Sequence, residues 1–164
     1  MADIELMNTK EKQIKNASIY MIPVIVGNLL PIITLPIFTR ILSVHDYGIY
    51  ALAQAYALFI NGISNFGLTI GYERNFFENK EVSKRSGLLY STLAFVSATS
   101  LLFAVFTFLF KSKLSGWVMG SSQYGSILFW SYCATAMMTL KTYYLIYFKN
   151  TENAKAFVWY TMDE

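Results

Sequence analysis

The chain has 164 residues, a net charge of +3, and 55% apolar residues against 14% charged ones. Ordinary soluble domains carry about 25% charged residues, so this composition excludes a typical soluble domain and indicates a chain that lies largely in lipid. The small positive charge does not suggest a nucleic-acid partner, and the single cysteine excludes an intrachain disulfide.

Charged residues avoid four long windows, and these predict four transmembrane helices. Lipid offers no hydrogen bonds to a backbone, so an apolar run of about 20 residues must close its bonds internally as a helix. The predicted fold class is therefore an all-α, polytopic membrane protein. The expected order is a cytoplasmic amphipathic arm (1–16), spans at 17–40 and 49–72, a cytoplasmic loop (73–86), spans at 87–110 and 124–148, and a cytoplasmic tail that begins a truncated fifth span (149–164).

Basic residues alternate between the two sides of these windows. The arm, the loop at 73–86 and the tail hold nine Lys and Arg residues, whereas the other two connections hold three when Arg40, at the end of the first span, is counted with them. Cytoplasmic loops of membrane proteins are enriched in Lys and Arg. This count predicts a multi-pass protein with a cytoplasmic N-terminus.

The first window contains all three prolines of the chain, Pro23, Pro31 and Pro36, with Gly27 between the first two. Each proline deletes a backbone hydrogen bond that neighbouring helices or a water-filled cavity must replace. Bent or broken helices beside a binding site are common in transporters, although prolines also have packing roles. These four residues are candidate hinge positions.

A polar stripe follows one face of the second window. At 100° per residue, Gln54, Asn61 and Asn65 share that face with Tyr72. An unpaired amide in hydrocarbon costs several kcal/mol, so the stripe should face other helices or a hydrated cavity. Both readings stay open, because small residues nearby also permit close helix packing.

The third window has only Ser and Thr as polar residues, so it is the best candidate for a lipid-facing helix. The fourth contains Lys141, the one charge well inside a span. An intramembrane cation indicates a site for an anionic group. Snorkelling of the side chain to the cytoplasmic interface is the alternative.

Two short blocks resemble a known family. Residues 35–43 (LPIFTRILS) are followed by DYGIY at 46–50, and NFGL at 65–68 is followed by YERNFF at 72–77. These blocks resemble the polysaccharide and O-antigen transporters, the Wzx-type flippases of the multidrug/oligosaccharidyl-lipid/polysaccharide (MOP) superfamily. Together with the spacing of the windows, the resemblance covers about residues 15 to 160.

The resemblance implies a flippase that moves an undecaprenyl-diphosphate-linked oligosaccharide across the bacterial inner membrane for O-antigen, capsule or exopolysaccharide synthesis. Arg40 and Arg74 match the family's motif arginines and are candidate diphosphate contacts, because a guanidinium donates to phosphate in a planar fork. The alternative is that both anchor the helix at the membrane interface, with Arg74 paired to Glu73 or Glu78. With Gln54, Asn61, Asn65 and Lys141 they form the set of candidate substrate-binding residues.

The family has two similar lobes, and this sequence resembles the start of the N-terminal one. The expected partners are therefore the lipid-linked oligosaccharide, membrane lipid and further C-terminal helices of the same protein. A small four-helix membrane protein, working as a homo-oligomeric transporter or scaffold, is the alternative. No enzyme is indicated: we expect no catalytic residue, no metal and no cofactor, since no Walker loop or metal-ligand cluster appears.

Overall fold

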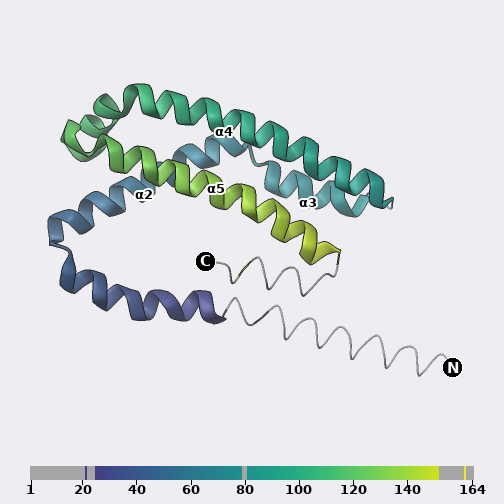
Figure 1. The fold of residues 1–164 in the computed structure, drawn as a ribbon, viewed down its shortest axis with the longest axis horizontal. Coiled ribbons are helices and arrows are strands. Elements are labelled where there is room, and N and C mark those ends of the chain that lie inside the picture. The colour runs from purple at the N-terminus through teal and green to yellow at the C-terminus, as the bar shows by residue number, and fades with distance from the viewer. Residues whose placement is uncertain (1–20, 22–24, 79–80, 152–160, 162–164) are drawn as a thin grey trace. The chain divides into compact units, whose positions relative to one another are not determined.

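The computed structural model describes residue 21, residues 25–78, residues 81–151 and residue 161, and these are helical apart from short connections (Figure 1). The expected all-α fold is confirmed. The arm at 1–16, most of the tail and Pro23 lie outside the described residues. The chain divides into two compact units, residues 1–41 with 145–164 and residues 42–144, and each is described by itself.

The N-terminal helix runs from Ile25 to Ile41 and continues through Pro31 and Pro36. Proline fixes φ near −65°, which is a helical value, but its ring removes one N–H donor and crowds the carbonyl four residues earlier. Whether these prolines and Gly27 act as hinges stays a prediction. Side chains of this helix are mostly exposed within the chain.

A threonine stands three residues after each of these two prolines, and its hydroxyl bonds within the helix. Thr34 Oγ1 donates to Leu30 O at 3.0 Å, and Thr39 Oγ1 donates to Pro36 O at 3.1 Å. Threonine commonly returns its hydroxyl to a carbonyl one turn earlier. The polar atoms of both side chains are thus satisfied without a second helix.

The second helix, α2 (Val44–Asn65), begins at a side-chain cap. The N–H of Asp46 donates to Ser43 Oγ at 3.1 Å, and Ser43 Oγ donates to the Asp46 carboxylate at 2.6 Å. This pair satisfies a backbone donor at the helix start and places an acidic residue in the first turn, where the helix dipole favours it.

The structure breaks the expected second span, 49–72, into two helices. α2 ends at Asn65, and α3 (Leu68–Glu78) begins after Phe66 and Gly67. Phe66 has φ 50° and Gly67 has φ 67°, both in the left-handed region that a right-handed helix cannot include. Apolar composition did not reveal this break, because it reports the solvent around a segment rather than its backbone conformation.

The expected cytoplasmic loop at 73–86 is also largely helical. α3 extends to Glu78, and α4 (Val82–Met119) begins after a short connection. Charge excludes a residue from hydrocarbon but not from a helix. Pairs at helical spacing support both segments: Arg74 with Glu78 and Lys84 with Glu81.

α4 is longer than the span at 87–110 expected from hydropathy. At about 1.5 Å per residue, its 38 residues extend roughly 57 Å, more than the hydrocarbon core needs. It ends at Gly120, which takes a left-handed conformation with φ 72°. In the described part of the chain, Ser83–Met119 is the one helix of at least 18 residues that passes the length and composition criteria for crossing a membrane.

The last described helix, α5 (Gly125–Asn150), follows a short 3₁₀ turn at Ser122–Tyr124 and has nearly the bounds of the expected fourth span. A β-carbon on Gly125 would lie 2.9 Å from the backbone oxygen of Lys111. Glycine therefore permits a close approach of α5 to the backbone of α4 at Lys111.

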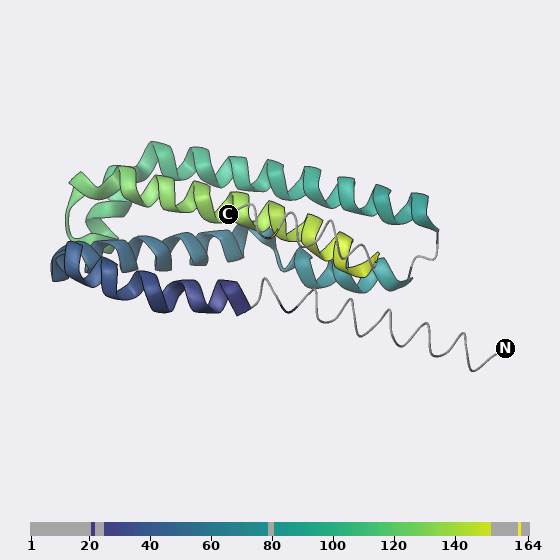
Figure 2. The ribbon, with the colours of Figure 1, turned by 60° about the horizontal axis from the view of Figure 1, so that its bottom comes forward.

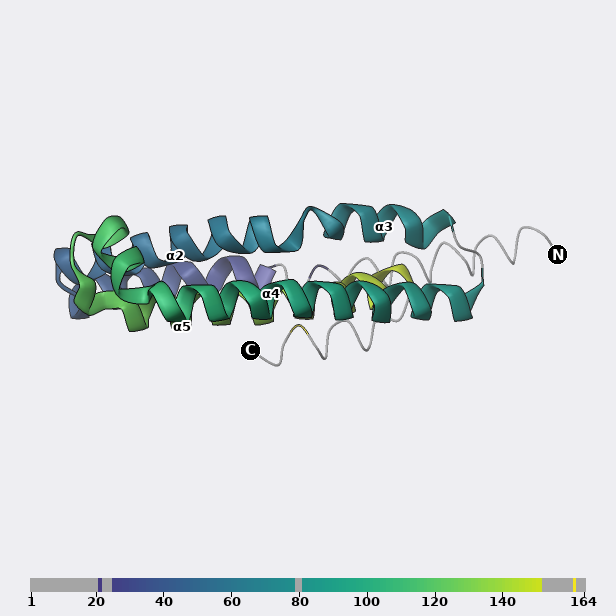
Figure 3. The ribbon, with the colours of Figure 1, turned by 90° about the horizontal axis from the view of Figure 1, so that it is seen from above.

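Within residues 42–144, α4 runs antiparallel to α2 and α5, and all three lie side by side (Figures 1 and 2). Seen from above, α2 and α3 follow one another along α4, with an offset at the break (Figure 3). One cluster of buried side chains joins α2 to α5, and α4 residues pack against it. Its buried members are Tyr56, Ala57, Leu128, Tyr132 and Ala136.

α4 exposes large apolar side chains such as Leu101, Leu102 and Leu109, each more than 60% exposed. Its buried polar residues face the rest of the unit: the Thr107 hydroxyl bonds to Tyr56 of α2, the backbone oxygen of Ser100 accepts from Tyr132 of α5, and Ser115 Oγ donates to the backbone oxygen of Ser121. That the third span faces lipid stays a prediction.

Candidate functional site

Buried polar side chains lie between the helices of residues 42–144. Tyr56 on α2 and Thr107 on α4 bond through their hydroxyls at 2.9 Å, and the Tyr132 hydroxyl on α5 donates to Ser100 O at 3.1 Å. Such bonds are needed because a phenol cannot be left unpaired in an apolar interior without cost. They tie α4 to both of its neighbours.

Asn61, from the predicted polar stripe, faces α5. Its Nδ2 donates to Thr139 Oγ1 at 2.7 Å, and the Thr139 hydroxyl donates in turn to Thr135 O at 3.1 Å. Asn61 Oδ1 is buried and has no hydrogen-bond partner among the described atoms. The Asn61 amide thus links α2 to α5 through its nitrogen only.

Asn65, at the end of α2, belongs to a second cluster that we call the break cluster: Asn65, Thr69 and Tyr143. Asn65 Oδ1 accepts a bond of 2.6 Å from the Tyr143 hydroxyl, and Asn65 Nδ2 donates to Thr69 Oγ1 at 2.9 Å. Thr69 Oγ1 lies 3.3 Å from the Tyr143 hydroxyl. Three helices therefore meet at this point, because Thr69 lies on α3 and Tyr143 on α5.

Gln54 differs from the other two amides of the stripe. Its Nε2 donates to the hydroxyl of Tyr50, one turn earlier on the same helix, at 3.3 Å. Tyr72, the fourth residue of the stripe, is 2% exposed and packs edge-on against Tyr143, with ring centroids 5.6 Å apart. The structure therefore brings Asn61, Asn65 and Tyr72 to α5 and leaves Gln54 in a local contact.

Of the two motif arginines, Arg74 lies on α3 with its side chain 81% exposed. Its Nε lies 3.4 Å from Glu78 Oε1, a carboxylate that is itself 60% exposed. The pairing with Glu78, one of the alternatives from the sequence, is thus present. An exposed ion pair of this kind contributes about 0 to 1 kcal/mol, so the guanidinium remains available to a competing anion.

Arg40 is exposed and lies in the last turn of the N-terminal helix, in the other unit. Gly27, Pro31 and Pro36 lie on the same helix, and a β-carbon on Gly27 would meet no atom within 4 Å. Arg40 and Arg74 thus come from different units, and each is described within its own. Lys141 is half-buried on α5, two residues before Tyr143.

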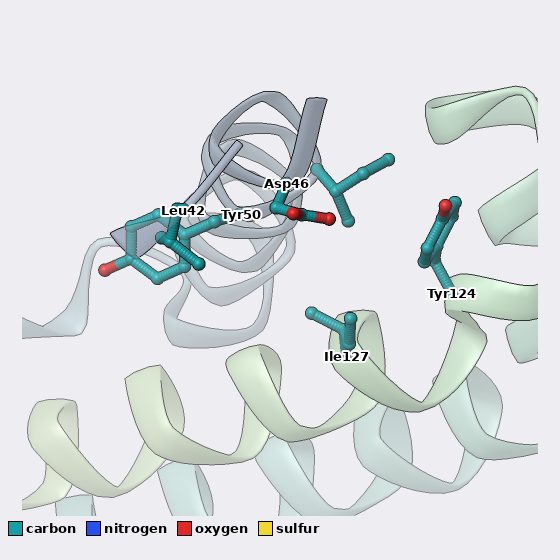
Figure 4. Close-up of a pocket in the computed structure, with 6 residues that line it drawn as sticks. Leu42, Asp46, Tyr50, Tyr124 and Ile127 are labelled. Atoms are coloured by element: carbon teal, nitrogen blue, oxygen red, sulfur yellow. The ribbon is translucent and has the colours of Figure 1, made fainter. Parts of the chain in front are cut away.

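A pocket of about 330 Å³ lies where α2 begins and α5 follows the 3₁₀ turn (Figure 4). In this view Asp46 and Tyr124 lie on opposite sides of the pocket, and Ile127 lies below them. Its other lining residues are Leu42, Ile49 and Tyr50. The walls are mainly apolar, with one carboxylate.

Sequence reasoning did not identify this pocket. A contact beside it closes one edge, since His45 Nε2 lies 3.0 Å from the Tyr124 hydroxyl. These two residues are 79 positions apart, and no periodicity within a window relates them. One side of the pocket is lined by residues of the DYGIY block at 46–50. The other side is lined by Tyr124, in the turn after α4, and by Ile127, at the start of α5.

A comparison with protein families matches residues 14–162 to a family described as "Polysaccharide biosynthesis protein". No curated protein and no solved structure matches the chain. The matched range includes every described helix and both motif blocks, so the resemblance seen in the sequence is confirmed at the level of the family.

Proposed function

Because this chain belongs to the polysaccharide biosynthesis protein family and is an all-α membrane protein, we propose that it acts in the translocation of a polyprenyl-diphosphate-linked oligosaccharide across the bacterial inner membrane. The family match over residues 14–162 is the observation that carries this proposal. The role is transport without a chemical step, and surface polysaccharide synthesis consumes the product.

The diphosphate is the part of such a substrate whose charge the protein must stabilise inside the membrane. A polyprenyl tail remains in lipid, but two phosphates carry charge into a region that cannot solvate it. Arg74 has the required chemistry, because its guanidinium offers several N–H donors in a fork that matches phosphate oxygens. Its exposure and its weak pairing with Glu78 permit exchange of the carboxylate for phosphate.

Arg40, in the other unit, and Lys141, on α5, are separate candidates from the sequence for an anionic group. Asn61 and Asn65 have a different role in this proposal. Both bond to α5, so they maintain the helix contacts that position α3 rather than offering free amides to a sugar. Gln54, which bonds only weakly within its own helix, is the stripe residue best able to bond a sugar hydroxyl.

Binding of undecaprenyl diphosphate to the chain in lipid nanodiscs tests the proposal. We expect Arg74→Lys to weaken binding at least tenfold, since hydrogen bonds to a charged group are worth about 1.5–3 kcal/mol and lysine lacks the fork. Arg85→Lys is the matched control: Arg85 lies on α4 over the Phe76 ring, a contact that a lysine also makes.

Two outcomes of that measurement count against the proposal. Undecaprenyl diphosphate that binds no better than phosphatidylglycerol would overturn the substrate class. Equal affinity in Arg74→Lys and the native chain would remove Arg74 from the diphosphate site. In cells, loss of the gene should make lipid-linked oligosaccharide accumulate, and reintroducing it should reverse that accumulation.

The proposed orientation places the N-terminus and residues 73–86 in the cytoplasm, from the count of basic residues. Ser83 and Ser122 are exposed and lie at the two ends of the α4 region. In a Cys133→Ala background, a membrane-impermeant thiol reagent added to intact cells should label Ser122→Cys and spare Ser83→Cys. Labelling of Ser83→Cys alone would reverse the orientation.

A further inference from the structure

The two residues between α2 and α3 have an unusual backbone. Phe66 is the only residue other than glycine with a positive φ among those that the structure describes. A side chain with a β-carbon disfavours this conformation, and a bulky aromatic one does so strongly. Its ring is 65% exposed and meets Phe95 of α4 edge-on, with centroids 6.2 Å apart. The strain at Phe66 is therefore compensated elsewhere.

The break cluster lies on either side of this strained residue in the sequence and joins both helices to α5. Asn65 is the last residue of α2, Thr69 lies in the first turn of α3, and both bond to the fully buried Tyr143 of α5. All three bonds join side chains. They can therefore open and re-form while the backbone hydrogen bonds of the helices stay intact.

Beyond the cluster, α3 packs through aromatic rings. Tyr72 and Phe76 are at most 2% exposed; Tyr72 meets Tyr143 edge-on, and the Arg85 guanidinium lies 4.8 Å from the centre of the Phe76 ring. Edge-on ring pairs and a cation over a ring face add attraction beyond the burial of apolar area, so these contacts hold α3 against α4 and α5 in the described arrangement. The exposed face of α3 carries Arg74.

We propose that Phe66–Gly67 is a hinge about which α3 tilts relative to α2, and that the break cluster is the latch that holds α3 against α5. Gly67 allows the backbone to change conformation at low cost. Phe66 has a disfavoured positive φ, so opening the latch lets its backbone return to a favoured conformation. Tilting α3 moves Arg74. The link between this motion and diphosphate handling rests on the proposed function.

Distances between paired spin labels test the hinge in the whole chain in lipid nanodiscs, with Cys133→Ala as background. Labels at Phe59→Cys on α2 and Phe77→Cys on α3 span the break, and both positions are more than 60% exposed. Labels at Tyr90→Cys and Leu109→Cys, equally exposed and with nearly the same sequence separation, are the control within α4. We expect two distance populations across the break and one narrow population in α4.

Two variants then test the latch and the hinge separately. Tyr143→Phe keeps the ring but removes the hydroxyl shared by Asn65 and Thr69, and it should raise the second population at least about threefold. Phe66→Leu with Gly67→Ala favours a continuous helix and should leave one narrow population near 27 Å, the length of roughly 18 helical residues.

A single narrow population across the break, in both the native chain and Tyr143→Phe, would overturn the hinge. No substrate enters these measurements. A rigid break thus overturns the hinge and leaves the proposed function standing, whereas absent diphosphate binding overturns the function and leaves the hinge.

Discussion

The N-terminal helix, Ile25–Ile41, contains two prolines and continues through both, whereas the apolar stretch at 49–72 contains none and breaks at Phe66–Gly67. The difference lies in the dihedral angle each residue allows. Proline costs a hydrogen bond but keeps φ at a helical value, and Phe66 and Gly67 take positive φ, which ends a right-handed helix at once. Counting prolines therefore does not locate helix breaks in this chain.

The two regions also differ in how their polar groups are satisfied. Thr34 and Thr39 bond within their own helix, whereas Asn65 and Thr69 bond to each other across the break and to Tyr143 on another helix. A break in hydrocarbon persists only where neighbouring groups replace lost hydrogen bonds. Four experiments sharpen or break this comparison.

The largest effect is expected at Tyr143. Tyr143→Ala removes a fully buried ring and the hydroxyl of the break cluster, so the free energy of unfolding, measured by titrating detergent micelles with SDS, should fall by about 3–5 kcal/mol. Ile33→Ala in the proline helix, at a side chain 66% exposed, should change it by less than about 0.5 kcal/mol. Equal losses would mean that the two regions depend on tertiary packing alike.

A substitution at Gly125 tests steric crowding alone, because this glycine has a close neighbour but no positive φ. Gly125→Ala should lower the free energy of unfolding by about 1–3 kcal/mol, because the new methyl group would lie 2.9 Å from a backbone oxygen that cannot easily shift. The same SDS titration measures it. An unchanged free energy of unfolding would show that α4 and α5 can move apart near Gly125 and Lys111 without cost.

Gly67 tests the backbone alone, since a β-carbon there would meet no atom within 4 Å. Gly67→Ala should still cost about 1–2 kcal/mol, because φ is 67°. Gly27→Ala is the matched change in the proline helix and should raise the free energy of unfolding by up to about 1 kcal/mol. If both changes stabilise the chain, the break is not held in the left-handed conformation.

Threonine-to-valine changes compare the hydroxyls of the two regions and should have the smallest effects. Thr69→Val loses its bonds to Asn65 and Tyr143 and should cost about 0.5–1.5 kcal/mol in the same titration. Thr34→Val and Thr39→Val should stay within about 0.5 kcal/mol, because each hydroxyl serves only its own helix. The opposite ranking would contradict the assignment of the break cluster as a tertiary contact.

Part of the helix pattern could be read from the sequence. The observed helices differ from the apolar windows in their ends and, at Phe66–Gly67, in a break. The fourth apolar window, 124–148, nearly coincides with α5, but the third, 87–110, is only the middle of α4. Hydropathy marks where a helix enters water, and a helix such as α4 continues past that point until Gly120 ends it. The Asn65–Phe66–Gly67 segment carried a helix-ending glycine, a signal that the apolar window concealed.

The sequence by itself determined the fold class, because hydrophobicity is a property of neighbouring residues, and the match over residues 14–162 to the polysaccharide biosynthesis protein family supplied the family. The tertiary structure decided that Asn61 meets Thr139, that Asn65 meets Tyr143, and that His45 meets Tyr124. Each of these pairs joins residues more than 70 positions apart. Periodicity shows which face of a helix is polar, and only the packing of distant helices decides what that face contacts.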